Sequence, residues 1–325
     1  MLAGGIVRRV CILLALALAM AGFCRGAQAA DALRVAKSSP ESFSFVPLDL
    51  GIAAGIFKKY GIDVQIVGFS GGPKMHQALA AGAIDVAFGS GPQMILTAKG
   101  SPMMAVAEMA GVPTNFAVIV PYDSPLRTLD DLKGKRIGVS GIPSLSSFMA
   151  EEVALSRGWG EAGIKPVGIG GRNYGVVAAL RTHQVDAVTF DLRVGLQLEQ
   201  TRQGRVLAPC SDYIKHFITH VIFAQNDVIK NKPDVLRRFL KGWFETIRYI
   251  KDHKADTVAV ASKVTGAPAA LEALEYDQTA PHFFSADGRF RQADLAAVAK
   301  SLVMLKDAAT PPDMSKLYTE AFLPK

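Results

Sequence analysis

The stretch RIGVSGIPSLSSFMAEEVALSRG, residues 136–158, decides the fold class. It begins with a short β-branched apolar run, residues 136–140, which ends in a Gly-Ile-Pro turn. Residues 145–153 then place apolar side chains at helical spacing. The stretch therefore predicts a strand, a loop and the start of a helix, which is one unit of an α/β sheet.

Three serines, Ser144, Ser146 and Ser147, lie where this helix begins. The N-terminus of a helix has unpaired backbone N–H groups and carries the positive end of the helix dipole. Serines at this position either cap the helix or share its donors with a bound anion. Both interpretations stay open from this stretch alone.

The first thirty residues are typical of a secretory signal peptide. Arg8 and Arg9 precede the apolar run 10–21, and the small residues around Ala29 predict cleavage near Ala29 or Ala30. Removing residues 1–30 takes away three arginines and no acids, so the formal charge falls from +7 to +4. We therefore expect an exported, periplasmic protein with no transmembrane span in its mature chain.

The mature composition excludes several classes of protein. Cys210 is the one cysteine left after cleavage, so no internal disulfide can form. Basic and acidic residues are interspersed without a long basic stripe, so no nucleic-acid partner is expected. The length of the mature chain is natural for two lobes.

A strand, a polar loop and a helix recur along the chain. Strand-like runs lie at 33–36, 63–67 and 84–88, with helical patterns at 47–60, which Gly61 ends, and at 74–81. Further apolar runs follow at 103–107 and 116–120, after which the pattern restarts with a capped helix at 128–135, a strand at 167–169, a helix at 176–181 and a strand at 185–190. We therefore predict an α/β fold of two similar lobes, each a mostly parallel sheet with flanking helices.

An internal repeat supports the two lobes. Residues 79–88 and 180–190 share the order of a helix-ending leucine, a turn, a branched apolar residue, an aspartate and a strand. The repeat indicates that Asp85 and Asp186 are turn residues and not catalytic acids.

The last third of the chain predicts a return to the first lobe followed by helices. We expect the chain to leave the second lobe from Val206 and to return through a strand at 220–224. Pro233 then begins a long amphipathic helix, and further helices are expected at 268–276 and 292–306. This helical tail is expected to pack on the first lobe.

The chain resembles the periplasmic solute-binding proteins of ABC importers. The branch is that of the nitrate, sulfonate and taurine binders and the NMT1/THI5-like pyrimidine binders, with the type II periplasmic binding fold. The motifs are PL at 47–48, GIF at 55–57, GIDV at 61–64, AGAIDVA at 81–87, DLKGKRIGV at 131–139 and VDA at 185–187. They concern the framework and do not identify the solute.

The resemblance implies two lobes, with crossing segments at about 115–121 and 213–224. Lobe 1 would comprise residues 31–115 and 221–325, and lobe 2 residues 116–220. Such a protein binds a small solute between its lobes and delivers it to an ABC permease in the inner membrane, without chemistry, cofactor or metal, and is expected to be a monomer. Its solute-binding loops, carried onto this chain, contain Ser39, Glu41, Ser42, Phe43, Phe45, Ser70, Gly71, Ser90, Gly91, Ser144, Ser146, Ser147, Arg172, Asn173, Tyr174 and Asp191.

The residues favour a small organic anion, such as a sulfonate or carboxylate, with an apolar body. Arg172 and the three serines are candidates to hold the anionic group, and Phe43, Phe45 and Tyr174 to hold the apolar part. The alternatives are that the phenylalanines belong to the core and that Arg172 pairs with a surface acid. If Glu41 and Asp191 both face the cleft, a cationic or hydrogen-bond-donating solute is the better prediction.

Other functions fit parts of the sequence. The same fold hosts a pyrimidine-synthesis enzyme with a cysteine-rich iron motif, which Cys210 alone does not reproduce. His216 and His220 lie four residues apart but lack an evident third metal ligand. The glycine-rich stretch 168–175 misses the spacing of a dinucleotide fingerprint. A subunit that presents its solute to a membrane sensor is a further alternative.

Overall fold

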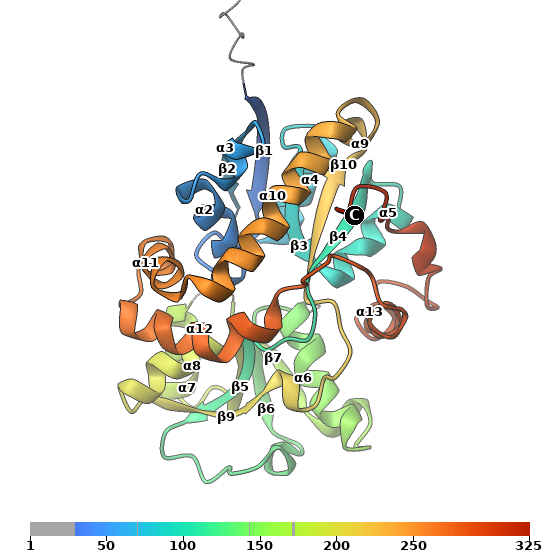
Figure 1. Ribbon diagram of the computed structural model, residues 1–325. Helices are drawn as coiled ribbons and strands as arrows, with labels where there is room; N and C mark the ends of the chain where they lie inside the picture. The colour runs from blue at the N-terminus through green and yellow to red at the C-terminus, as the bar shows by residue number, and fades with distance from the viewer. Residues whose placement is uncertain (1–29, 70, 143, 171–172) are drawn as a thin grey trace, which may run out of the picture.

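The chain folds into two five-stranded sheets with flanking helices (Figure 1). The structure is a computed structural model that describes residues 30–325 with the exception of 70, 143 and 171–172. The predicted signal peptide lies, but for Ala30, outside the described residues and stays a prediction. None of the described helices is long and apolar enough to cross a membrane.

The first sheet has the strand order β2-β1-β3-β10-β4. Its strands are β1 (Asp31–Lys37), β2 (Ile62–Gly68), β3 (Val86–Ser90), β4 (Met103–Ala110) and β10 (His220–Gln225). Strand β1 pairs in parallel with β2 and β3, whereas β10 runs antiparallel to β3 and β4. The predicted return strand is therefore confirmed, and it inserts between two strands of the first sheet.

The second sheet repeats this plan with the order β7-β6-β8-β5-β9. Its strands are β5 (Phe116–Pro121), β6 (Arg136–Val139), β7 (Lys165–Gly168), β8 (Ala187–Asp191) and β9 (Gly204–Pro209). The expectation that the chain leaves this unit from Val206 is wrong, because Val206 lies within β9 and pairs antiparallel with β5. The apolar run at 206–208 has the β propensity to complete this sheet before the chain crosses back.

The sequence repeat corresponds to the same ionic clasp in both sheets. The Asp85 carboxylate accepts hydrogen bonds from the backbone N–H of Arg34 at 2.8 Å and from its Nη2 at 2.7 Å. Asp186 accepts the equivalent bonds from Arg136 at 2.8 and 2.9 Å. Each aspartate ties a helix-to-strand turn to the start of a neighbouring strand, as expected of turn residues.

The helices around the first sheet begin directly after β1. They are η1 (Phe43–Phe45), α2 (Val46–Ala53), α3 (Ile56–Lys59), α4 (Gly72–Ala80), η2 (Gly91–Met94) and α5 (Ile95–Ala98). The single helix predicted over 47–60 is wrong, because Gly55 takes a left-handed φ of 70° and divides it into α2 and α3. The spacing of Ile52 from Leu48 and Ile56 would place it on the inner face of that helix, but it is 40% exposed.

Helices also flank the second sheet. They are η3 (Leu129–Leu132), α6 (Leu145–Ser156), η4 (Glu161–Gly163), α7 (Asn173–Arg181), α8 (Leu192–Gln200) and η5 (Cys210–Asp212). The helix predicted over 128–135 is a short 3₁₀ turn with Thr128 at its N-cap. Helix α8 was not predicted; Gly195 within it packs closely on Ile119 and Val206, where a larger side chain would not fit.

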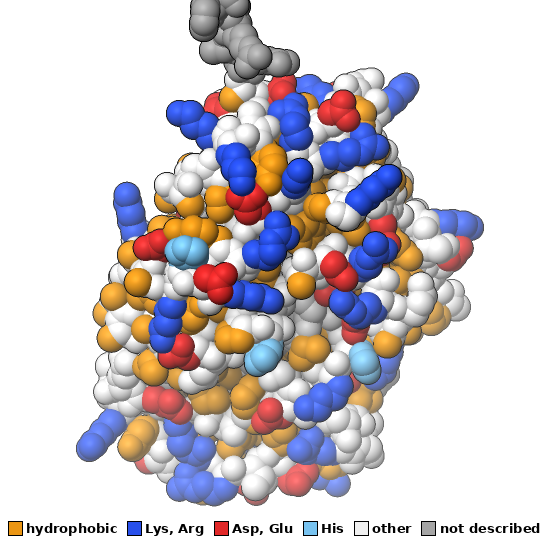
Figure 2. Space-filling view, in the orientation of Figure 1, with side chains coloured by type: hydrophobic (Ala, Val, Ile, Leu, Met, Phe, Trp, Pro, Cys, Tyr) orange, Lys and Arg blue, Asp and Glu red, His pale blue; other side chains and the backbone are white. Residues whose placement is uncertain are grey.

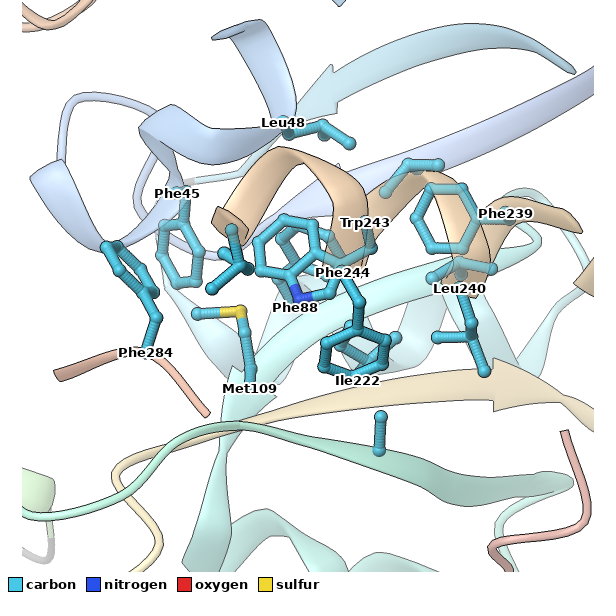
Figure 3. Packing of buried hydrophobic residues seen from close by; sticks show 14 of the residues in the cluster. Phe45, Leu48, Phe88, Met109, Ile222, Phe239, Leu240, Trp243, Phe244 and Phe284 are labelled. Atoms are coloured by element: carbon cyan, nitrogen blue, oxygen red, sulfur yellow. The ribbon is translucent and has the colours of Figure 1, made fainter. Parts of the chain in front are cut away.

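The C-terminal part is helical, as predicted. It comprises α9 (Asn226–Asn231), α10 (Pro233–Asp252), α11 (Lys254–Thr265), α12 (Ala269–Phe283), α13 (Gln292–Met304) and η6 (Met314–Lys316). The predicted apolar stripe of α10 is buried, and Phe239 stacks on Phe57 while Trp243 contacts Phe88 edge-on at 4.8 Å (Figure 3). These aromatic contacts lie within the first-sheet core.

The expectation that the whole tail packs on the first lobe is wrong for α12. Leu271 of α12 joins a core cluster with Leu192 and Leu196 of α8, which flanks the second sheet. Helix α12 therefore lies across the junction between the two sheets, as Figure 1 shows. This position brings tail residues into the candidate site.

Candidate functional site

The carboxyl ends of the parallel strands face one another where the chain crosses between the sheets. At the end of β3, Ser90 pairs with His220, which lies within the second crossing segment. At the end of β8, Asp191 pairs with Phe116, which lies within the first crossing segment. Loops that follow the parallel strands of both sheets therefore gather at this junction, where α/β proteins place their ligands.

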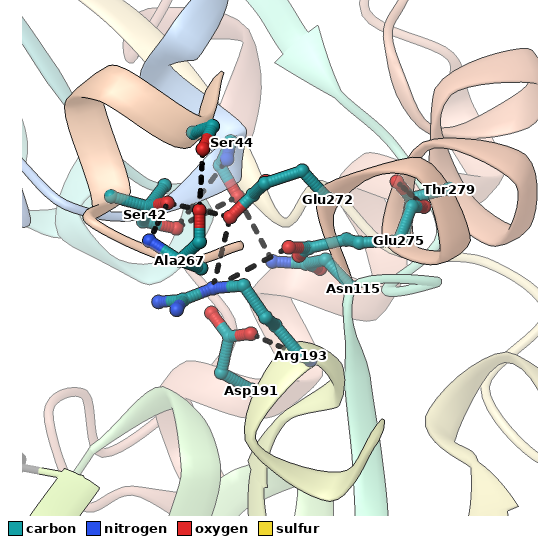
Figure 4. Close-up of polar contacts among 11 residues, drawn as sticks. Ser42, Ser44, Asn115, Asp191, Arg193, Ala267, Glu272, Glu275 and Thr279 are labelled. Atoms are coloured by element: carbon teal, nitrogen blue, oxygen red, sulfur yellow. Dashed lines mark hydrogen bonds and ion pairs between the residues drawn. The ribbon is translucent and has the colours of Figure 1, made fainter. Parts of the chain in front are cut away.

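A group of polar side chains, which we name the junction cluster, converges here (Figure 4). Its members come from η1, the first crossing segment, the start of α8 and the inner face of α12. The junction cluster consists of Ser44, Asn115, Asp191, Arg193, Glu272 and Glu275. The amide of Asn115 donates to the Ser44 hydroxyl at 3.0 Å, and the Asp191 carboxylate accepts from the backbone N–H of Arg193 at 3.0 Å.

Two buried carboxyl groups share one guanidinium in this cluster. Nε of Arg193 lies 3.5 Å from Oε2 of Glu275 and 3.9 Å from Oε1 of Glu272. Both glutamates are 0% exposed and Arg193 is 7% exposed. These distances fit ion pairs but are too long for good hydrogen bonds, so the charges are close without being fully satisfied.

Several buried atoms of the cluster have no hydrogen-bond partner among the described residues. They include both carboxylate oxygens of Glu275, Oε2 of Glu272, Nε of Arg193 and Oδ1 of Asn115. Within the same residues, the Arg193 side chain donates no hydrogen bond at all, whereas Oε1 of Glu272 accepts one from Thr265 at 2.5 Å. Such a concentration of unpaired buried polar atoms requires an explanation.

Burial dominates the electrostatics of the cluster. It raises the pKa of Glu272 above the ordinary value, and the Arg193 charge opposes this only in part. Burial, followed by the charge of Asp191, raises the pKa of Glu275 well above its usual range. Burial likewise raises the pKa of Asp191. Burial therefore favours the neutral, protonated form of these carboxyl groups more than water would.

The predicted residues of the first-sheet loops lie in different surroundings. Ser39 and Glu41 are exposed, and Ser42 is half-buried and caps η1. Phe43 and Phe45 are buried in the first-sheet core, the alternative that the sequence left open. Ser70 lies outside the described residues.

Three more predicted residues lie in tight turns of the first sheet. Gly71 has a φ of 111° and its N–H donates to the Ser38 carbonyl. Ser90 forms a capping box with Gln93 at the start of η2. Gly91 is buried, and a Cβ there would lie 2.1 Å from the carbonyl oxygen of Ile218, so the close approach of the second crossing segment requires glycine.

The predicted serines of the second sheet cap their own helix. The Ser144 hydroxyl accepts from the N–H of Ser147 at 3.1 Å, and the Ser147 hydroxyl accepts from the N–H of Ser144 at 2.9 Å. The Ser146 hydroxyl accepts from the N–H of Ser140 at 2.9 Å. Arg172 lies outside the described residues. Asn173 begins α7, and Tyr174 beside it is 75% exposed.

Sequence reasoning found Asp191 and missed the rest of the junction cluster. Glu272 and Glu275 lie three residues apart on one face of α12, with Thr279 one turn further. This spacing was the available signal, but acids on one helix face usually indicate a solvated surface. Nothing in the local sequence marked Asn115 or Arg193 as buried.

The histidines and the cysteine have separate surroundings. His216 contacts Asp294 at 3.2 Å, whereas His220 contacts the Gly89 carbonyl at 3.3 Å. Burial lowers the pKa of His220 to about 4 and raises that of Cys210 to about 12, so the thiol is inert. Among the described residues, no group of three or more His, Cys, Asp or Glu side chains is arranged to hold a metal ion.

The surface agrees with the mixed charge of the sequence. On the face shown in Figure 2, blue basic and red acidic side chains are interspersed over both halves of the molecule. No single-sign area covers this face, so its charge pattern does not favour nucleic acid.

Comparison with known proteins adds a family to this geometry. A family model described as NMT1/THI5 like matches residues 42–257. The chain is 28% identical over 208 residues to a Haemophilus influenzae protein provisionally named a thiamine biosynthesis protein. This match covers 61% of the chain and 62% of the Haemophilus influenzae protein. It is also 28% identical over 192 residues to a Brucella abortus protein provisionally named a binding protein, 57% of each chain. The matches thus span less than two thirds of these relatives.

Solved structures share the fold. The periplasmic aliphatic sulphonate-binding protein of Escherichia coli has a TM-score of 0.74 at 20% identity, over 89% of this chain and 92% of that one. A desulfurization enzyme, DSZB, has a TM-score of 0.63 at 16% identity, over 90% and 97%. The two-sheet architecture is therefore that of periplasmic binding proteins, and this fold also hosts an enzyme.

Proposed function

Because the chain belongs to the NMT1/THI5-like family, we propose that it is the extracytoplasmic solute-binding component of an ABC transporter. In this role it captures a small solute between its two sheets and delivers it to a membrane permease. The observation that carries the proposal is the junction cluster, where buried polar atoms lack partners among the described residues. A bound solute would supply the missing hydrogen bonds.

We propose that lobe 1 comprises residues 31–115 and 221–325 and that lobe 2 comprises residues 116–220. The crossing segments would act as the hinge, and closure of the lobes would bury the solute. Apart from Ala30, the predicted signal peptide lies outside the described residues, and its cleavage would place the mature protein in the periplasm.

The solute we propose is a small organic molecule with an anionic group, such as a sulfonate or a carboxylate. The support is the N-terminus of α6, where Ser144 is half-buried and the helix dipole favours a negative charge. The name of the Escherichia coli protein of similar fold, an aliphatic sulphonate binder, agrees with this class. Arg172 is the proposed partner of the anionic group.

Two kinds of possible nucleophile among the described residues, a thiol and three serine hydroxyls, bear on whether the protein captures its solute without chemistry. The Cys210 thiol is buried and its pKa is raised, so it is protonated at neutral pH. The hydroxyls of Ser144, Ser146 and Ser147 are engaged within the cap of α6. Carboxyl groups of raised pKa, such as those of the junction cluster, can act as general acids or bases, so recovery of the solute unchanged is the test of capture without chemistry.

The test is native mass spectrometry of gently purified protein, followed by denaturation and identification of the released molecule. Thermal shifts against sulfonates, carboxylates and nitrate follow, because a ligand at a hundred times its Kd stabilises the folded form by about 2.7 kcal/mol. We expect an organic anion to be recovered unchanged and to raise the melting temperature. Conversion of the molecule, or no bound and no stabilising solute, would overturn the proposal.

Two variants test the anionic group. Arg172→Ala is expected to weaken binding of the recovered anion by about 10-fold or more, because a charge-assisted hydrogen bond is lost. Arg181→Ala, at the other end of α7 and exposed, is the matched control and should leave affinity unchanged. Equal affinities in both variants would refute the role of Arg172.

A further inference from the structure

The junction cluster holds more negative than positive charge. Asp191, Glu272 and Glu275 surround Arg193, which is the cation that the ion pairs of the cluster share. Full ionisation would leave two negative charges uncompensated in a site where both glutamates are 0% exposed. An unpaired buried carboxylate is costly, so folding alone does not account for this arrangement.

The cluster also has more buried hydrogen-bond acceptors than donors to pair with them. Both oxygens of Glu275, Oε2 of Glu272 and Oδ1 of Asn115 are buried acceptors without a donor among the described residues. Asn115 is an uncharged amide, 1% exposed, whose other end already donates to Ser44. Nε of Arg193 is a buried donor without an acceptor among the same residues, so the unpaired acceptors outnumber the unpaired donor. A partner with N–H or O–H donors would satisfy these acceptors, and a positive charge would also balance the carboxylates.

A divalent metal ion fits this site poorly. The described residues contain no metal-binding group of three or more His, Cys, Asp or Glu. A nitrogen group of an organic molecule can donate to acceptors on several sides and does not need the fixed coordination number and distances of a metal ion.

We propose that Glu275, together with Glu272 and Asp191, forms a subsite for a protonated nitrogen group of the solute, such as an amine, amidine or guanidine. This inference rests on the proposed function and extends it, because it adds a cationic group to a solute whose anionic group is held elsewhere. The subsite joins the start of α8 to α12, so the bound nitrogen connects elements that flank different sheets.

The test compares solutes that differ only in this group. Taurine is compared with isethionate, and benzamidine with benzamide, by isothermal titration calorimetry on the full protein purified without bound solute. We expect the nitrogen cation to bind about 10- to 100-fold tighter than its neutral partner, as one or two charge-assisted hydrogen bonds would give. The solute released from gently purified protein should likewise contain a basic nitrogen.

Matched variants assign the effect to the subsite. Glu275→Gln preserves shape and is expected to reduce the preference for the cation by about 10-fold or more. Asp191→Asn is a second variant that retains a good N-cap for α8. Asp277→Asn, an exposed residue of the same helix paired with Lys254, is the control and should leave the preference unchanged. Circular dichroism and the melting temperature check that each variant is folded.

The outcomes separate this inference from the proposed function. A bound solute that lacks a basic nitrogen, or a preference for the cation that Glu275→Gln and Asp191→Asn leave intact, overturns the subsite and leaves solute binding standing. Altered stability in these variants with unchanged preference assigns the cluster a structural role and also overturns it. The absence of any bound or stabilising solute overturns the proposed function and this inference together.

Discussion

Two joints connect the tail helices to the part of the chain that carries the second sheet, and they are built differently. At one joint, α6 meets α13: Phe148 of α6 stacks on Phe217 of the second crossing segment, with ring centroids 4.8 Å apart, and both join a core cluster with Val298 of α13. At the surface of this joint, Nζ of Lys300 lies 2.9 Å from Oε1 of Glu152. At the other, α12 meets α8 through Arg193 and the buried glutamates, whose oxygens lack partners among the described residues. The first joint is held by an apolar contact and a surface ion pair, whereas the second leaves buried polar atoms unpaired among the described residues.

The contrast separates stability from binding. An apolar contact of stacked rings stabilises the fold in any state in which the rings remain buried. Buried charges without full hydrogen bonding destabilise the empty protein, and their cost is offset when a ligand arrives. We therefore expect substitutions at the first joint to act on stability and those at the second to act mainly on binding and on pH dependence.

The largest effect is expected at the apolar joint. Phe217→Ala removes a fully buried ring and should lower the free energy of unfolding by about 3–5 kcal/mol. Urea denaturation followed by circular dichroism measures this loss. Ile52→Ala, at a 40% exposed position, is the control with a much smaller change. A loss below about 1 kcal/mol for Phe217→Ala would contradict the role assigned to this joint.

The next effect is expected from the cation of the polar joint. Arg193→Met leaves the two buried glutamates without their counter-charge and should cost about 3 kcal/mol at neutral pH. Lys300→Met at the other joint removes an exposed partner and should cost less than about 1 kcal/mol. Both are measured by urea denaturation, and equal costs would remove the distinction between the joints.

Substitution of Glu275, the glutamate beside Arg193, should raise the free energy of unfolding instead of lowering it. Burial raises the folded pKa of Glu275 above its ordinary value of 4.5, so the folded protein holds a proton that the unfolded chain releases. Stability therefore falls as pH rises from this value towards the folded pKa. Glu275→Gln should remove this fall and raise the free energy of unfolding by about 1–3 kcal/mol near pH 8. Asp277→Asn is the control, and an equal gain in both variants would contradict the prediction.

The smallest effects are expected at the two ionic clasps. Their arginines hold the pKa of Asp85 and Asp186 below the usual range, so each contributes stability that is lost as pH falls through the folded pKa. The Asp85 side chain is 8% exposed and that of Asp186 is 31% exposed. Asp85→Asn should therefore cost about 1–2 kcal/mol and Asp186→Asn less than about 1 kcal/mol, after screening. Thermal unfolding at neutral pH measures the pair, and the reverse order would be inconsistent with burial as the cause.

Much of the fold could be predicted because its signals are local. The turn glycines, the repeated aspartate turns and the apolar stripe of α10 each lie within a few residues, and the strands they predict exist. The errors lie where distant contacts decide the outcome. Strand β9 depends on pairing with β5, and the position of α12 depends on its packing against α8.

The candidate site divides in the same way. Asp191 could be predicted because it follows a strand, and the serines of α6 because they begin a helix; the structure gives their hydroxyls cap partners within that helix and an adjoining loop. Glu272 and Glu275 could not be predicted, because acids on one face of a helix are normally solvated. Their burial requires α12 to lie across the junction against α8.

Short-range periodicity and turn chemistry are enough to predict the alternation of strands and helices, the two similar sheets and the family. Which charges are buried together depends on tertiary packing. Arg193 and Glu275 lie far apart in the chain, and their 3.5 Å contact depends on the packing of α12 against α8. A buried charge is defined by its surroundings in space, and local sequence does not specify those surroundings.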